Sequence, residues 1–228
     1  MEEEKKKFNP YIIIIVILVL AVAALAYNQW GKRFLPGKST NGGQGVVKPQ
    51  NIKTEIFKDD IQIGNSDAPV TIIEYYSYLC AYCKQFEDET KAKIVENYIT
   101  TGKAKLILRP FPPHELGQAV LCANDQNKFL EYHDYLFKNA ANIKQINDLK
   151  TFAVAVGING SQFNECLDSG KYKARAEAWY NQGTADFKKA NIPTAQQGTP
   201  AFFINGEPLI GALSYEKFAE VIDKQLTK

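Results

Sequence analysis

Two cysteines, Cys80 and Cys83, are the residues of this sequence best suited to redox chemistry. They follow an apolar and aromatic run, Val70 to Tyr76, and open a segment with the pattern of a helix. At a helix N-terminus, unpaired backbone N–H groups and the helix dipole favour a thiolate over a thiol. The spacing places Cys83 one turn further along the same side of the helix, within reach of a disulfide. We therefore expect a redox-active pair.

The same spacing also occurs in half of a zinc site and in inert structural disulfides. A zinc ion would need two further ligands, yet the remaining cysteines, Cys122 and Cys166, are isolated from each other and the chain has only 2 histidines. We therefore expect neither a metal nor a cofactor. An inert disulfide remains the alternative for Cys80 and Cys83.

An uninterrupted apolar run extends from Tyr11 to Tyr27 and carries no charge. At about 1.5 Å per residue it spans roughly 25 Å, close to a bilayer core of about 30 Å. The run is longer than the apolar part of most signal peptides, so residues 1–30 are predicted to contain a retained transmembrane anchor at about 11–27. Ala24-Leu25-Ala26 offers a small-x-small cleavage pattern, which leaves a cleaved signal peptide as the alternative.

The rest of the chain divides into a linker and one domain. Residues 31–50 are rich in glycine, proline, lysine, asparagine and serine and have no apolar periodicity, which predicts a flexible linker. Residues 51–228 are long enough to form one domain with a sizeable core. The 27 lysines and arginines nearly balance 25 acidic residues and are dispersed, so no nucleic-acid-binding stripe is present.

The apolar patterning of this domain predicts strands and helices in a specific order. The expected elements are strands at Ile61–Ile63 and Val70–Tyr76, a helix from Ala81 to about Ile99, a strand at Lys105–Arg109, a helical block at about 114–190, a hairpin of Ala201–Ile204 and Glu207–Ile210 around Asn205-Gly206, and a helix at Ser214–Leu226 with Ser214 as N-cap. This order is that of a thioredoxin fold with a helical domain inserted in its middle.

Several motifs resemble the DsbA-type thiol:disulfide oxidoreductases, in particular the membrane-tethered members of their thioredoxin-like branch. The motifs are Glu74 to Cys83, Arg109-Pro110-Phe111-Pro112-Pro113-His114, Cys122 to Phe137, Cys166 to Gly170, and Gly198 to Gly206. The resemblance covers about Ile61 to Gln225 and implies an α/β thioredoxin fold with an inserted helical domain, preceded here by one N-terminal transmembrane helix.

The resemblance implies distinct roles for the residues around the pair. Cys80 would be the exposed sulfur that substrate thiolates attack, and Cys83 its buried partner. The position of Cys80 nearer the helix start agrees, since a better stabilised thiolate leaves faster. Glu74 would be a buried acid that moves a proton to or from Cys83, with a pKa raised by burial. The alternative for Glu74 is a solvent-facing strand residue.

Thr199-Pro200 is the second signature of the resemblance. The resemblance implies a cis peptide bond against the redox pair, with the backbone of Thr199 free to bind a substrate strand. Without the resemblance, a trans proline in a turn would be expected, because few X-Pro bonds are cis. Tyr82, among the tyrosines near the pair, is expected to offer aromatic surface to unfolded peptide substrates.

Cys122 and Cys166 form an even pair in a chain placed outside the cytoplasm, so a structural disulfide is expected, with free buried thiols as the alternative. His114 and His133 are expected to be structural rather than catalytic. One departure from the family concerns the dipeptide between the cysteines, where Ala81 replaces the usual proline and no histidine is present. This change leaves the strength and direction of the redox reaction open.

The expected function is that of an extracytoplasmic disulfide donor. The chain would be a single-pass protein of the cell membrane, with its catalytic domain on the extracytoplasmic side. It would oxidise reduced exported proteins and be reoxidised by a membrane quinone-linked partner of the DsbB or vitamin-K-epoxide-reductase type. We expect a monomer that binds no nucleic acid. The alternatives are a membrane-tethered disulfide reductase or isomerase and, from another class, a non-catalytic binding or chaperone module.

Overall fold

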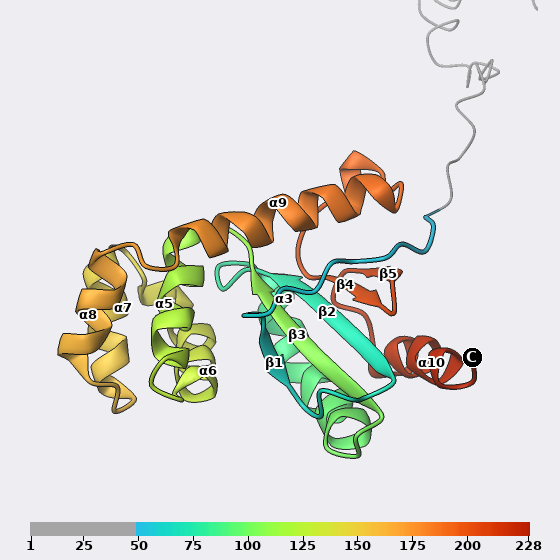
Figure 1. Ribbon diagram of the computed structural model, residues 1–228, viewed down its shortest axis with the longest axis horizontal. Coiled ribbons are helices and arrows are strands. Elements are labelled where there is room, and N and C mark those ends of the chain that lie inside the picture. Colours follow the sequence, from blue (N-terminus) through green and yellow to red (C-terminus); the bar gives the residue numbers. More distant parts are fainter. Residues whose placement is uncertain (1–48) are drawn as a thin grey trace, which may run out of the picture. The chain divides into compact units, whose positions relative to one another are not determined.

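A five-stranded sheet in the order β1-β3-β2-β4-β5 organises residues 49–228, the part of the chain that the computed structural model describes (Figure 1). Strands β2 and β3 run parallel, and the other neighbouring strands run antiparallel. The strands are β1 (Ile61–Ile63), β2 (Val70–Tyr76), β3 (Ala104–Pro110), β4 (Ala201–Ile204) and β5 (Glu207–Ile210). Every strand predicted from the sequence is confirmed, and β3 is one residue longer at each end than predicted.

A continuous helical segment starts directly after Cys80 and ends at Ile99. It consists of α3 (Ala81–Phe86), a π-helical turn (Glu87–Lys91), α4 (Ala92–Ile94) and a second π-helical turn (Val95–Ile99). Gly102 stops it, because its φ of +72° lies in the left-handed region that glycine adopts at helix ends. The predicted helix is confirmed over its whole length, and the two π-helical turns were not predicted.

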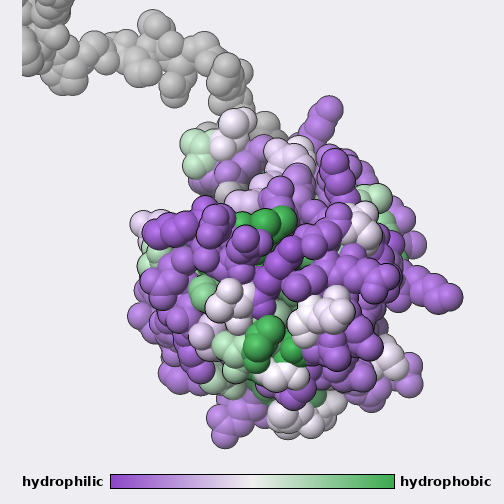
Figure 2. Space-filling model, turned by 90° about the vertical axis from the view of Figure 1, so that its left-hand side faces the viewer, coloured by the Kyte–Doolittle hydropathy of each residue, from purple (hydrophilic) through white to green (hydrophobic). Residues whose placement is uncertain are grey.

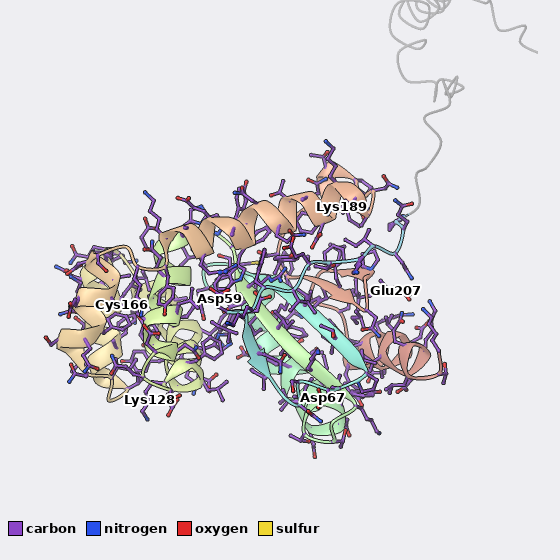
Figure 3. All side chains as sticks on the ribbon, in the orientation of Figure 1. Asp59, Asp67, Lys128, Cys166, Lys189 and Glu207 are labelled. Carbon is purple, nitrogen blue, oxygen red and sulfur yellow. A yellow bond between two sulfur atoms is a disulfide. The ribbon has the colours of Figure 1, made fainter. Side chains whose placement is uncertain are left out.

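A block of helices is inserted between β3 and β4 and lies at one end of the sheet, with α9 extending across a face of it (Figure 1). The helices are α5 (His114–Asn124), α6 (Phe129–Asn139), a 3-10 turn (Ala140–Asn142), α7 (Ile146–Ala155), α8 (Gly160–Asp168) and α9 (Lys173–Lys189). A disulfide between Cys122 and Cys166 joins α5 to α8 (Figure 3). The helical insertion is thus confirmed, and the alternative of two free thiols is wrong.

The chain ends with the predicted hairpin and helix. Asn205 and Gly206 both have positive φ, 46° and 84°, which is the type I′ geometry that an Asn-Gly hairpin turn requires. Helix α10 (Tyr215–Leu226) follows, with Ser214 at its N-cap. The side chain of Ser214 makes no capping hydrogen bond, so this residue occupies the predicted position without the predicted contact.

The two faces of the sheet are covered by different helices. Side chains alternate along β2, so that Ile72 and Tyr76 lie in the layer beneath the helical segment and α10, whereas Ile73 and Tyr75 pack against Phe187 of α9. Strand β2 is therefore buried on both sides, which accounts for its nearly continuous apolar sequence.

The segment before β1 is fastened to the sheet at both of its ends. Near its start, the N–H of Ile52 donates to the carbonyl of Gly206, 2.9 Å away. A Cβ at Gly206 would lie only 1.7 Å from the Ile52 carbonyl oxygen, so glycine is required there. Near its end, Asp60 accepts hydrogen bonds from buried Arg109 of β3, and Asp59 pairs with Arg175 of α9 (Figure 3).

The predicted anchor at about 11–27 and most of the predicted linker at 31–50 lie outside the described residues. Within residues 49–228, no helix combines the length and the apolar character needed to cross a bilayer.

Candidate active site

Cys80 and Cys83 lie at the start of α3, where the chain leaves the end of β2, and both are free thiols in this structure. Cys80 is the N-cap residue, with an extended backbone, and is partly exposed. Cys83 is completely buried beneath it. The structure thus brings the two sulfurs to one turn of helix but gives them opposite exposure.

The surroundings of Cys80 favour its thiolate. Partial burial of the thiol raises its pKa, but hydrogen bonds from Thr199 and from the backbone N–H groups of Cys83 and Tyr82 outweigh this effect. The net pKa of Cys80 is lowered. In the protonated form, the Sγ of Cys80 donates to the carbonyl oxygen of Thr199 at 3.2 Å. The helix N-terminus predicted to stabilise this sulfur is therefore present.

The surroundings of Cys83 favour its thiol. Burial raises the pKa of Cys83 strongly, and the charges of Cys80 and Glu74 add to this effect. The backbone N–H of Ser77 donates to the Sγ of Cys83 at 3.4 Å, which opposes the shift without reversing it. The two sulfurs therefore differ in the direction of their pKa shifts, and only Cys80 is stabilised as a leaving thiolate.

Glu74 is completely buried on β2, on the face that carries the helical segment. Its partners across the sheet are Leu108 and Phe202, and neither carboxyl oxygen has a hydrogen-bond partner within residues 49–228. Burial, followed by the charge of Glu87, raises the pKa of Glu74 to about 8. The alternative of a solvent-facing strand residue is therefore wrong. A protonated carboxyl at neutral pH is a group that can donate a proton.

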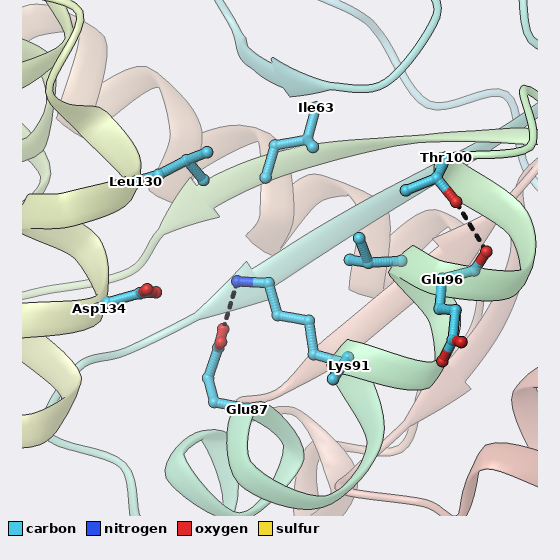
Figure 4. Close-up of a pocket in the computed structure, with 9 residues that line it drawn as sticks. Ile63, Glu87, Lys91, Glu96, Thr100, Leu130 and Asp134 are labelled. Atoms are coloured by element: carbon cyan, nitrogen blue, oxygen red, sulfur yellow. Dashed lines mark hydrogen bonds and ion pairs between the residues drawn. The ribbon is translucent and has the colours of Figure 1, made fainter.

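A largely buried ion pair of Glu87 and Lys91, which sequence reasoning missed, acts on Glu74. Glu87 and Lys91 both belong to the first π-helical turn, and the Nζ of Lys91 is 2.9 Å from the Oε1 of Glu87. They line a pocket of about 510 Å³ that also contacts Leu130 and Asp134 of α6 (Figure 4). Their separation of four residues was a usable signal for an ion pair on a helix, but nothing in the sequence placed it against Glu74.

His133 joins the same cluster from α6. Its Nε2 is 2.8 Å from the Nζ of Lys91, and the ring is completely buried. The other histidine, His114, is not among these contacts; it lies at the start of α5 and makes an edge-to-face contact with Tyr180 of α9. The sequence predicted a structural role for both histidines without distinguishing them, whereas in the structure His133 belongs to this cluster and His114 does not.

The Thr199-Pro200 peptide bond is cis and lies against Cys80, as the resemblance implied. Beside the pair, Leu79 and Tyr82 are exposed large hydrophobic side chains, with exposed fractions of 52% and 67%. Leu79 lines two pockets, one shared with Cys80 and the other with Ile146 of α7. The surface of the helical block is otherwise mostly hydrophilic, with small hydrophobic areas (Figure 2). Apolar surface is thus available next to the exposed sulfur.

Residues 49–228 contain no group of three or more histidine, cysteine or acidic side chains that could hold a metal ion.

The thioredoxin family model matches residues 57–224. This chain belongs to the thioredoxin family. The matched residues include the redox pair, the buried carboxyl of Glu74 and Thr199-Pro200. The thioredoxin fold with its helical insertion is therefore confirmed, and the thioredoxin-family assignment extends over most of the described residues.

Several relatives of this chain have names that refer to disulfide chemistry. The chain is 26% identical over 188 residues to a protein of Rickettsia felis named as a protein-disulfide oxidoreductase. That match covers 79% of this chain but only 65% of the relative, so the chain spans slightly less than two thirds of the relative's length.

Several solved structures share the fold, including the two that follow. BdbD of Bacillus subtilis, in its oxidised form, matches with a TM-score of 0.67 and 22% identity, over 80% of this chain and all of that chain (100%). Alpha-DsbA1 of Wolbachia pipientis matches with a TM-score of 0.63 and 25% identity, over 75% of this chain and 93% of that chain. The resemblance to DsbA-type proteins seen in the sequence is thereby confirmed.

Proposed function

We propose that this chain is an extracytoplasmic thiol:disulfide oxidoreductase that donates a disulfide from Cys80 and Cys83 to dithiols in exported proteins. One observation carries the proposal: the exposed sulfur has a lowered pKa, and its buried partner has a raised one. A pair of this kind releases Cys80 readily as a thiolate and keeps Cys83 out of contact with substrate. The relatives named for disulfide exchange support the same reaction.

The reaction begins from the oxidised pair. A substrate thiolate attacks the Sγ of Cys80, a bond forms between the two sulfurs, and the electron pair of the broken disulfide passes to Cys83. Because the pKa of Cys83 is strongly raised, its sulfur must take up a proton, and Glu74 is the buried acid placed to supply it. The proton of Glu74 is then replaced from solvent.

The second step releases the product. A second substrate thiolate attacks the substrate sulfur of the mixed disulfide, and Cys80 leaves as a thiolate. The substrate loses two electrons and gains a disulfide, while the enzyme gains the two electrons and becomes the dithiol. The backbone of Thr199 and the exposed side chain of Tyr82 would bind the extended peptide around the reacting sulfur.

The proposed location is the outer side of the cell membrane, with the apolar run Tyr11 to Tyr27 as a single-pass anchor. A disulfide between Cys122 and Cys166 supports an oxidising compartment. The dithiol formed in each cycle would be reoxidised by a membrane quinone-linked partner of the DsbB or vitamin-K-epoxide-reductase type. The chain would act as a monomer.

The test follows the oxidation of a reduced test protein by the oxidised full-length chain. We expect a fast transfer of one disulfide per chain, abolished by Cys80→Ser and by Cys83→Ser, because neither variant can form the disulfide between residues 80 and 83 that oxidises the substrate. Absence of dithiol oxidation by the wild-type chain would end the proposal. A reduction potential near or below that of thioredoxin, about −270 mV, would instead favour the reductase or isomerase.

A further inference from the structure

The two ring nitrogens of His133 face different groups. Nε2 lies 2.8 Å from the Nζ of Lys91 and 3.2 Å from the Oε1 of Glu87. Nδ1 lies 2.8 Å from the hydroxyl of Tyr78 and 3.3 Å from that of Tyr76. The ring therefore bridges the buried ion pair and a pair of buried tyrosines, and the thiol chemistry proposed above leaves this bridge without a role.

The hydrogen bonds assign one arrangement of protons. Lys91, as an ammonium beside the carboxylate of Glu87, has only donors, so its shorter contact of 2.8 Å assigns the Nε2 of His133 as the acceptor, and the longer contact of 3.2 Å between Nε2 and the Oε1 of Glu87 then carries no hydrogen bond. The proton of a neutral ring then lies on Nδ1 and is donated to Tyr78. Burial and the charge of Lys91 lower the pKa of His133, in agreement with a neutral ring.

Glu74 faces this cluster but is not bonded to it. The charge of Lys91 acts on Glu74, yet no hydrogen bond or ion pair joins the two side chains within residues 49–228. The other groups that act on Glu74 are Cys83 on α3, Glu87 on the π-helical turn and Tyr76 on β2, and its cross-strand partners are the apolar Leu108 of β3 and Phe202 of β4. Among these groups Lys91 carries the positive charge, so its position decides whether the carboxyl group of Glu74 is part of an ion pair.

We propose that His133 is a positioning residue that accepts a hydrogen bond from Lys91 and, with Glu87, holds the ammonium away from the carboxyl of Glu74. The inference rests on the proposed function in one respect, that Glu74 serves as the proton donor to Cys83. An ammonium bonded directly to Glu74 would keep that carboxyl ionised at neutral pH. Cys83 would then lack a buried donor when the disulfide opens.

Two substitutions separate the two sides of the ring. In His133→Gln the side-chain amide can reach the position of Nε2 and still accept from Lys91, whereas in His133→Asn it can reach only that of Nδ1, beside Tyr78. We expect His133→Gln to keep the pKa of Glu74 near the wild-type value of about 8. We expect His133→Asn to lower it by about 1 unit or more, because the released ammonium turns to Glu74.

The measurement is a carboxyl ¹³C NMR titration of the reduced, full-length, glutamate-labelled chain, with the Glu74 signal assigned by Glu74→Gln. His114→Gln is the matched control and should leave the Glu74 pKa unchanged, because His114 does not contact Glu87 or Lys91. In a Lys91→Met background, the Asn and Gln variants should give the same Glu74 pKa, since no ammonium remains to be held. Equal Glu74 pKa values for His133→Asn and His133→Gln with Lys91 present would overturn the proposal.

A second measurement needs no substitution at His133. The ¹⁵N shifts of the wild-type ring should show Nδ1 protonated and Nε2 unprotonated at pH 7, and a proton on Nε2 would sink the proposal. Neither readout depends on activity. Failure of the dithiol-oxidation test would therefore remove the proposed reaction, whereas a failed titration would remove only the role of His133.

Discussion

The Sγ of Cys80 lies 3.2 Å from the carbonyl oxygen of Thr199, although the two residues are 119 positions apart in the sequence. The side chain of Thr199 also lowers the pKa of Cys80 by hydrogen bonding. Thr199 therefore contacts the exposed sulfur through its carbonyl oxygen, and its side chain favours the thiolate, so the two effects can be separated by substitution.

Thr199→Val removes the hydroxyl and keeps the shape of the side chain. A hydrogen bond to a charged group contributes about 1.5 kcal/mol or more, so we expect the dithiol form to become less favourable by on the order of tenfold. Equilibration with a glutathione redox buffer measures this change. The control is Thr194→Val, at an exposed threonine that makes no contact with Cys80. An unchanged equilibrium in Thr199→Val would contradict the assigned hydrogen bond.

Glu74→Gln removes the buried acid without removing its bulk. We expect the opening of the active-site disulfide to slow by about 10²-fold at pH 6 to 7, the usual scale for loss of a positioned general acid. The ratio of wild-type to variant rates should fall as the pH rises through about 8, because Glu74 then loses its proton in the wild type. Stopped-flow mixing with a dithiol at several pH values measures the ratio. A ratio independent of pH would exclude Glu74 as the donor.

The same carboxyl should make stability depend on pH. Burial raises the folded-state pKa of Glu74 from 4.5 to about 8, so between these values the folded chain holds a proton that the unfolded chain has lost. Its contribution to stability is complete below about pH 4.5 and is lost as the pH rises through 8. Urea unfolding at pH 5 and pH 9 should therefore show a larger loss for the wild type than for Glu74→Gln, on the order of a few kcal/mol. Equal losses would contradict the shift.

Cys122→Ala/Cys166→Ala tests whether the second disulfide is structural. It closes a loop with a sequence separation of 44, and the chain-entropy relation gives roughly 4 kcal/mol for such a loop. We expect the free energy of unfolding to fall by about this amount. The reduction potential of Cys80 and Cys83 should stay the same, because α5 and α8 carry the second pair and neither sulfur touches the first. A changed potential would show that the two pairs are coupled.

The redox pair and the order of elements could be predicted because the information is local. Cys80 and Cys83 are close in sequence, the alternation and length of the apolar runs mark the strands, and Asn205-Gly206 has the backbone preference of its turn. Glu74 needed the family resemblance, since one acid in an apolar strand does not reveal which side of the sheet it faces. The resemblance was also the basis for the cis bond at Pro200.

The cluster around His133 could not be predicted. His133 lies 42 residues from Lys91 and 55 from Tyr78, so these contacts depend on how α6 packs against the sheet and the helical segment. The π-helical turn at Glu87–Lys91 has no clear sequence signature, yet it carries both members of the ion pair. The missing cap at Ser214 shows the same limit on a smaller scale: residue type fixed the position of the helix end but not the contact.

The hydrogen bond between Ile52 and Gly206 holds the segment before β1 at the end of β2 that is farther from the redox pair. Gly206 follows Asn205, which bonds to Thr71 at the beginning of β2, whereas Cys80 follows the other end of that strand. The length of β2 separates these ends by roughly 20 Å at about 3.3 Å per residue. Ile52 and Cys80 therefore lie toward opposite ends of β2, so a substrate bound at the exposed sulfur lies well away from the segment that pairs with Gly206.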